Sequence, residues 1–211
     1  MKIKAVFLIS ILLISVGCAS VYRSPNFYEM RDGHRLVAIL PFDVSISSTR
    51  LPKGMTVEML REMEKDEGYT TQALFYSRFL ARSGDFTVEF QDVDRTNTIL
   101  LRNDLDYESL RMMLKTEIAD LLGVDAVISG KIQRESPMSE AAALALGIVF
   151  GVFGSTKKVN VDFNIHDGQT GNLFWKYNHQ VSGSIGSSSE QLVKSLTRKI
   201  ARTFPYSIHT R

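Results

Sequence analysis

Residues 107–132 read YESLRMMLKTEIADLLGVDAVISGKI, and they decide the fold class. The first half repeats apolar side chains at the three- and four-residue spacing of one helix face. These are Leu110, Met113, Leu114, Ile118 and Leu121. Gly123 follows as the helix stop, because glycine readily adopts the left-handed conformation that ends helices. Residues 124–132 are then apolar and rich in β-branched side chains, which is typical of a buried strand. A helix, a glycine and a buried strand in immediate succession indicate an α/β arrangement.

Upstream, residues 36–42 (LVAILPF) form a continuous apolar run of strand length, as expected for a strand buried on both faces. Pro41 must lie near the end of this strand, because proline cannot donate to the ladder. Residues 57–67 and 69–82 have helical composition, and residues 86–90 alternate like a half-buried strand.

Downstream, apolar and polar residues alternate over 159–166, a turn follows at 167–171, and residues 172–181 return. This pattern predicts a β-hairpin. The capping-box residues 187–190 (SSSE) open a final amphipathic helix, whose apolar face carries Leu192, Leu196, Ile200 and Phe204. The order βαβαβββα predicts one α/β (α+β) domain over residues 36–206, a sandwich with a mixed β-sheet flanked by helices.

The amino terminus carries a secretion signal over residues 1–17, with a short basic start and an apolar run of about a dozen residues. This run is shorter than the roughly 20 residues needed to span a bilayer. Val16-Gly17-Cys18 resembles a bacterial lipobox, although Ser15 replaces the usual leucine. An ordinary signal peptide with an incidental cysteine is the alternative. Acylation of Cys18 would remove the oxidation liability of an unpaired thiol and would hold the protein on a membrane.

The residues after Cys18 bear on which membrane holds the protein and on how the lipid is joined to the domain. Ala19 and Ser20 lack the aspartate typical of inner-membrane retention, which favours the outer membrane with the domain in the periplasm. Residues 18–35 show no clear periodicity and are predicted to form a lipidated tether.

Composition excludes several classes of protein. The single cysteine rules out a disulfide scaffold. Once Lys2 and Lys4 are removed with the signal, 23 basic residues stand against 23 acidic ones, so no charge excess favours nucleic acid.

An apolar insert occupies residues 139–156, and its centre, residues 141–154, has no polar side chain. One interpretation is a short helix packed on the sheet of the domain itself. The other is an exposed surface for oligomer or membrane contact. The residues of that possible interaction surface are Leu144, Leu146, Gly147, Ile148, Phe150, Gly151 and Phe153. Fourteen residues are too short to span a bilayer as a helix, and they lack the alternation of a transmembrane hairpin.

No reactive constellation is visible. The histidines His34, His166, His179 and His209 are scattered without metal-ligand spacing, and His166 is expected to be exposed. Carboxylates end three predicted strands, at Asp43, Asp125 and Asp167, where turn solvation explains them as well as acid–base chemistry does. We therefore predict no catalytic residue, metal site or cofactor.

The assembled motifs resemble a superfamily of periplasmic domains. They are the lipobox, residues 37–42, the helix–glycine–strand unit 121–130, and a hairpin ending in Thr170-Gly171-x-Leu173-x-Trp175. The superfamily includes the curli-secretion channel lipoprotein, the amino-terminal domain of the TolB translocation protein and the lipoprotein activators of penicillin-binding proteins. The resemblance implies a fold and a compartment, and binding or assembly in place of catalysis.

We therefore expect an outer-membrane lipoprotein, anchored through Cys18, that acts without enzymatic activity as a binding or assembly factor for envelope proteins. Assembly, secretion and cell-wall synthesis are the candidate processes. The alternative is an oligomeric channel component of a secretion system, so a homo-oligomer is possible. An enzyme acting on peptidoglycan is the third hypothesis, and it lacks a visible nucleophile or acid–base pair.

Overall fold

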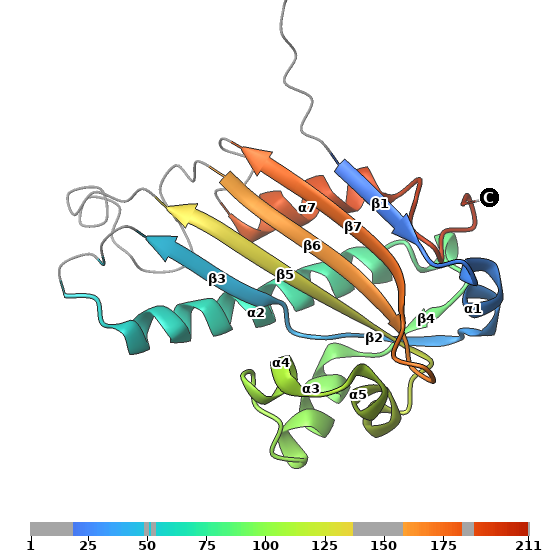
Figure 1. Ribbon diagram of the computed structural model, residues 1–211, viewed down its shortest axis with the longest axis horizontal. Helices are drawn as coiled ribbons and strands as arrows, with labels where there is room; N and C mark the ends of the chain where they lie inside the picture. Colours follow the sequence, from blue (N-terminus) through green and yellow to red (C-terminus); the bar gives the residue numbers. More distant parts are fainter. Residues whose placement is uncertain (1–18, 49–50, 52–53, 137–157, 183–187, 211) are drawn as a thin grey trace, which may run out of the picture.

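The computed structural model describes residues 19–48, 51, 54–136, 158–182 and 188–210. Within them, a seven-stranded mixed sheet forms the centre of the molecule (Figure 1). Its strands are β1 (Ala19–Arg23), β2 (Leu36–Ile39), β3 (Asp43–Ser48), β4 (Glu89–Phe90), β5 (Ala126–Ser136), β6 (Lys158–Asp167) and β7 (Leu173–Ser182). The strand order is β1-β7-β6-β5-β2-β4, and β3 pairs with β5 beyond the end of β2. The predicted α/β sandwich with a mixed sheet is confirmed.

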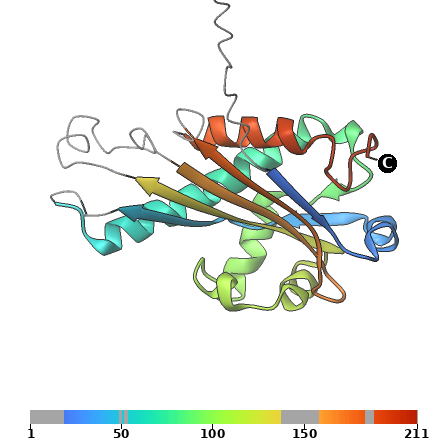
Figure 2. The ribbon, with the colours of Figure 1, turned by 45° about the horizontal axis from the view of Figure 1, so that its top comes forward.

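Helices cover the two faces of the sheet unequally. They are α1 (Phe27–Gly33), α2 (Val57–Leu80), α3 (Val93–Arg102), α4 (Ser109–Met112), α5 (Lys115–Leu122) and α7 (Ser189–Ile200). Figure 2 shows α2 and α7 along one face, whereas α3, α4 and α5 gather at one end of the other. The rest of that second face carries no described helix.

The core follows from the strand patterns. Val37 and Ile39 of β2 pack toward α2, while Ala38 and Leu40 pack toward α3 and α5, so both faces of this strand are buried, as predicted. The helix stop at Gly123 is also confirmed, since its φ of 65° is left-handed.

The predicted strand over residues 36–42 is wrong at its end. β2 stops at Ile39, the chain steps across Pro41, and β3 begins at Asp43. Both strands pair in parallel with β5, β2 along its first half and β3 along its second. The alternation of Val44 and Ile46 with serines is too short to indicate a strand, so β3 could not be predicted from the sequence.

Several other boundaries differ from the predictions. The two helical segments before residue 82 form one helix, α2, and the predicted strand 86–90 retains pairing only over Glu89–Phe90. The expected helix over 107–122 is divided into α4 and α5, and α3 was not predicted. The final helix begins at Ser189, with the hydroxyl of Ser188 accepting from the Gln191 amide at 3.3 Å.

The predicted tether over residues 18–35 needs correction, because most of it is folded. β1 pairs antiparallel with β7 from Ala19↔His179 to Arg23↔Trp175, and α1 buries Phe27 against Phe174. All five β1 side chains are exposed, so this strand is held by its backbone and carries no apolar alternation.

Candidate functional site

A polar surface covers the half of the sheet opposite α2 and α7. Along β5, β6 and β7, most apolar side chains point to α2 and α7, together with the buried Arg134 and His179, and most of the other polar side chains point the opposite way. We name this polar surface the open face, and it comprises Ser129, Lys131, Gln133, Asn160, Asp162, Asn164, Lys176, Asn178 and Gln180. Cross-strand contacts order it: Asn178 donates to Asp162 at 2.6 Å, and Gln180 donates to Asn160 at 2.9 Å. Polar side chains of this kind form the rim of protein–protein interfaces and supply their hydrogen bonds.

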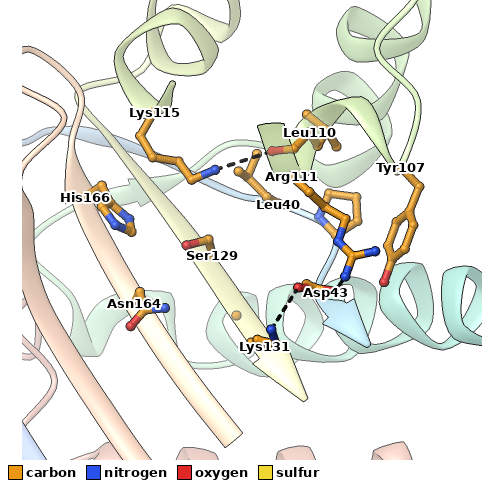
Figure 3. A pocket seen from close by; sticks show the side chains of 12 residues that line it. Leu40, Asp43, Tyr107, Leu110, Arg111, Lys115, Ser129, Lys131, Asn164 and His166 are labelled. Atoms are coloured by element: carbon orange, nitrogen blue, oxygen red, sulfur yellow. Dashed lines mark hydrogen bonds and ion pairs between the residues drawn. The ribbon is translucent and has the colours of Figure 1, made fainter. Parts of the chain in front are cut away.

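At one end of the open face, a pocket of about 270 Å³ lies against α4 and α5 (Figure 3). It is lined by Leu40, Pro41, Asp43, Tyr107, Leu110, Arg111, Lys115, Ser129, Gly130, Lys131, Asn164 and His166. The sheet supplies the floor, and α4 together with the first residue of α5 supplies the cationic wall.

Two of the three cations in this pocket already have carboxylate partners. Arg111 lies 2.8 Å from Asp43 and 3.0 Å from Glu108, and Lys131 lies 3.8 Å from Asp43. Because Asp43 faces both cations, it is committed to charge neutralisation and is not free to act as a base.

Lys115 is the third cation, and it forms no ion pair with any described carboxylate. Its ammonium group has the carbonyl of Leu110 at 3.5 Å, and burial lowers the pKa of this lysine. Figure 3 shows the Lys115 ammonium directed toward the Leu110 carbonyl, above the part of the sheet that carries Ser129 and His166. Among the residues that the structure describes, the pocket therefore holds one positive charge without an ion-pair partner.

His166 faces the same space, and its expected exposure is wrong. The side chain is half-buried, and burial together with the charge of Lys115 lowers its pKa to about 4. Its buried Nδ1 and the buried Oδ1 of Asn164 have no hydrogen-bond partner among the described residues. Buried polar atoms normally have a hydrogen-bond partner, so the part of the floor that β6 supplies has unused hydrogen-bonding groups.

Tyr107, which also lines the pocket, is not available for acid–base work. Its hydroxyl donates to the carbonyl of Phe42 at 2.7 Å and accepts from the amide of Val44 at 2.7 Å. Burial raises its pKa well above the ordinary range. These bonds instead hold the bend between β2 and β3.

A second polar cluster lies at the turn of the hairpin, where Asp167 directly follows His166 at the end of β6. Nδ1 of His34 lies 2.7 Å from the hydroxyl of Tyr206, and Nε2 lies 3.0 Å from Oδ1 of Asp167. A hydroxyl, an imidazole and a carboxylate in series have the composition of a catalytic relay. However, the Tyr206 side chain is fully buried and His34 is 3% exposed, so no substrate can reach the hydroxyl. The cluster fastens the amino-terminal, hairpin and carboxy-terminal segments together.

The third carboxylate at a strand end also has a structural role. Asp125 accepts hydrogen bonds from the amides of Arg35 and Leu36, at 2.7 and 2.8 Å. It therefore fixes the start of β2.

The site residues predicted from the sequence lie outside the described residues. They are Cys18 and the possible interaction surface Leu144, Leu146, Gly147, Ile148, Phe150, Gly151 and Phe153. Within the described residues, no group of three His, Cys, Asp or Glu side chains could hold a metal ion. None of the described helices has both the length and the apolar run needed to cross a bilayer.

The pocket could not be predicted from the sequence. Lys115 has the pattern of an ordinary helix-surface lysine, and only the packing of α5 against β5 and β6 brings it into the same pocket as His166. The alternation over residues 159–166 does place Asn164 and His166 on one face, which is the one signal available.

Among known proteins, similar folds occur in solved structures. The PelC dodecamer from Paraburkholderia phytofirmans is 17% identical with a TM-score of 0.43, covering 92% of this chain and 99% of that one. Lipoprotein GNA1162 from Neisseria meningitidis is 13% identical with a TM-score of 0.46, covering 79% and 98%. The LpoB C-terminal domain from Salmonella enterica is 11% identical with a TM-score of 0.36, covering 75% and 93%.

One of these solved structures is a lipoprotein, and the resemblance expected from the motifs is to lipoproteins as well. No protein-family model and no curated protein matches the chain. Likeness at these identities and TM-scores says nothing about what this chain binds.

Proposed function

We propose that this chain is a lipoprotein of the outer membrane, anchored through acylated Cys18, that binds another envelope protein through the open face of its sheet. It acts without catalysis. The signal over residues 1–17 and the lipobox support the anchor, and the open face supports the binding role.

The pairing of β1 with β7 is the observation that carries the proposal. Because the sheet begins at Ala19, the acylated residue would be the immediate neighbour of a strand. A tether of 18 flexible residues would let the domain reach far into the periplasm. With Ala19 already in the sheet, an acyl group on Cys18 would lie next to the sheet edge, so the domain would stand at the membrane surface in a restricted orientation.

The polar clusters support a role without catalysis. Tyr107 and Asp43 in the pocket, and His34 with Asp167 in the buried cluster, are each bonded to structural partners. General acid–base catalysis needs a titratable group within hydrogen-bond reach of a substrate. These groups are instead used to hold segments of the fold together.

The anchor is tested with radiolabelled palmitate and membrane fractionation of cells producing the full chain. We expect label in the outer-membrane fraction, and we expect Cys18→Ser to remove it. Ala19→Asp should move the labelled protein to the inner membrane, whereas Ser24→Asp, five residues further on, should not. Label retained in Cys18→Ser would contradict the anchor.

The binding surface is tested by photo-crosslinking in living cells. A photoreactive amino acid replaces Gln180, an exposed residue of the open face, and in a second variant it replaces Lys194, which is exposed on α7. A discrete adduct from position 180 that is absent from position 194 is the expected result. Equal adducts from both positions, or none from position 180, would contradict binding through the open face.

A further inference from the structure

We propose that the pocket beside α5 binds a single oxyanion, a carboxylate or phosphate group, between Lys115, His166 and Asn164. This inference deepens the proposed function, because it gives the chemistry that one end of the open face recognises. Its test measures neither acylation nor the binding of a partner protein, so the two proposals can fail separately.

Charge is the first argument. In the pocket and at its rim, Arg111 and Lys131 face the carboxylates of Asp43 and Glu108, and Lys115 lies in the same pocket without a carboxylate partner among the described residues. Those two carboxylates balance the charges of Arg111 and Lys131, so the positive charge of Lys115 remains without a counter-charge among the described residues. A partly buried ammonium with only a carbonyl at 3.5 Å is poorly stabilised, and an anion placed beside it would correct that.

Unused hydrogen-bonding groups are the second argument. Nδ1 of His166 and the amide of Asn164 lie on β6, at alternate positions of one strand face. An imidazole that carries its proton on Nδ1 donates from there, and a carboxamide turned about its last bond presents its NH₂ group. The hydroxyl of Ser129, on the neighbouring strand β5 opposite Asn164, can add a third neutral donor. An oxyanion accepts from all of these groups and from Lys115.

Size is the third argument. A volume of about 270 Å³ is just below the range typical of pockets that enclose whole drug-sized ligands. It suits one terminal group on a short stem, such as an acidic side chain, a carboxy terminus or a phosphate. The rest of the ligand would then lie along the open face.

Histidine-labelled NMR on the full chain tests the site, because His166 is a reporter inside it. The protein carries ¹³C-histidine in phosphatidylcholine nanodiscs, and His166→Asn assigns the signal. Sodium acetate and inorganic phosphate are titrated separately at constant ionic strength. We expect a saturable shift of the His166 signal, with a Kd on the order of 1–10 mM for such small probes. The signals of His34 and His179 should stay in place.

Matched variants separate the pocket from general electrostatics. Lys115→Gln should weaken binding at least tenfold, and Lys115→Arg should retain it within about threefold. Lys158→Gln removes a lysine from the exposed start of β6, outside the pocket, and should leave the affinity unchanged. The Arg variant also guards against loss of folding, since it keeps the charge and length of the side chain.

The outcomes distinguish the sources of the group. A response to soluble acetate or phosphate places the group on a soluble ligand or a partner. A shift that appears only with phosphatidylglycerol in the nanodiscs, and is lost in Lys115→Gln, assigns it to a lipid headgroup. The proposal is overturned if none of the probes moves the His166 signal saturably, or if Lys115→Gln binds as tightly as the unaltered protein.

Discussion

The imidazole Nε2 of His34 lies 3.0 Å from Oδ1 of Asp167, although 133 positions separate the two residues in the chain. The amide and hydroxyl of Thr170 donate to the other oxygen of Asp167, at 2.7 and 2.6 Å. One carboxylate thus holds both the hairpin turn and the segment that leads into β2. Because its partners come from distant parts of the chain, it contributes to the global stability of the domain.

Replacing Asp167 with asparagine should lower the free energy of unfolding at pH 7 by about 2 kcal/mol. Burial alone would raise the pKa of Asp167, but the hydrogen bonds from His34 and Thr170 outweigh it and hold the pKa below the ordinary value. The stabilisation is therefore present above the unfolded-state pKa of about 4 and is lost as pH falls through the lower folded-state value. Urea denaturation between pH 7 and pH 2.5 measures it.

In this series of measurements, the free energy of unfolding of Asp167→Asn should fall less below pH 4 than that of the unaltered protein. Asp66→Asn, on the exposed surface of α2, serves as the control. It should change neither the stability at pH 7 nor the loss of stability below pH 4. If Asp167→Asn lost as much stability in acid as the unaltered protein, protonation of Asp167 would not be a cause of that loss.

The fold class and the principal core strands could be predicted because apolar periodicity reports burial directly. Residues 124–132 and the hairpin carry that signal, and both form strands. β1 could not be predicted, because its side chains are exposed and only its backbone bonds to β7. Edge strands of this kind leave no apolar pattern in a sequence.

The candidate site was less predictable than the fold, because it depends on tertiary register. Lys115, Ser129 and His166 come from α5, β5 and β6, and only the pairing of Val127 with His166 and the packing of α5 bring them together. The identity of His34 as a partner of Asp167 has the same origin. Local patterns carry no information about such pairs.

Gly130 should not tolerate a side chain. A Cβ at this position of β5 would overlap the ring of Phe42, which is fully buried and stacked on Phe75 with ring centroids 5.0 Å apart. Overpacking of this kind costs roughly 1–3 kcal/mol, so Gly130→Ala should lower the melting temperature by several degrees. Gly84→Ala is the control, since no atom lies within 4 Å of its added Cβ. Calorimetry that finds both variants equally stable would refute the close approach of Phe42.

The ion pair of Arg134 and Glu67 should be sensitive to the loss of either partner. Nε of Arg134 lies 2.8 Å from Oε1 of Glu67, and the side chains are 0% and 6% exposed. Arg134→Met leaves a carboxylate buried without its cation, so we expect a loss of about 3–5 kcal/mol in urea denaturation. The double variant Arg134→Met/Glu67→Leu should recover part of that loss.

The exposed pair of Lys65 and Glu62 on α2 gives the comparison for this experiment. Lys65→Met should change stability by less than about 1 kcal/mol, because exposed ion pairs contribute little. A double variant less stable than Arg134→Met alone would contradict the interpretation that an unpaired charge causes the loss.

Replacing residues 19–23 with a Gly-Ser segment of equal length should expose the edge of β7. The amides of residues 175–179 that face β1 would then exchange with deuterium faster, while those of β5 and β6 would keep their protection. The global loss of stability should be small, about 1 kcal/mol, because β1 buries no side chain. Unchanged exchange in β7 would instead support the tether predicted from the sequence.

His179 should make the domain less stable in mild acid, because a cation lies beside it. Nζ of Lys199 lies 2.6 Å from Nε2 of the buried imidazole, and burial and this charge together lower the pKa of His179. A lowered folded-state pKa means that the unfolded chain binds the proton more readily. Stability is therefore lost as pH falls from about 6.5, the unfolded value, through the folded-state pKa.

Lys199→Met removes the charge, so the pKa of His179 should rise toward its ordinary value and the stability lost between pH 7.5 and pH 5 should shrink. Lys194→Met, five residues earlier and exposed on the same helix, should leave that loss unchanged. Urea denaturation at the two pH values measures both variants, and the His179 signal in histidine-labelled NMR reports the pKa directly. An unaltered pH dependence in Lys199→Met would contradict a contribution of this charge and assign the effect to burial alone.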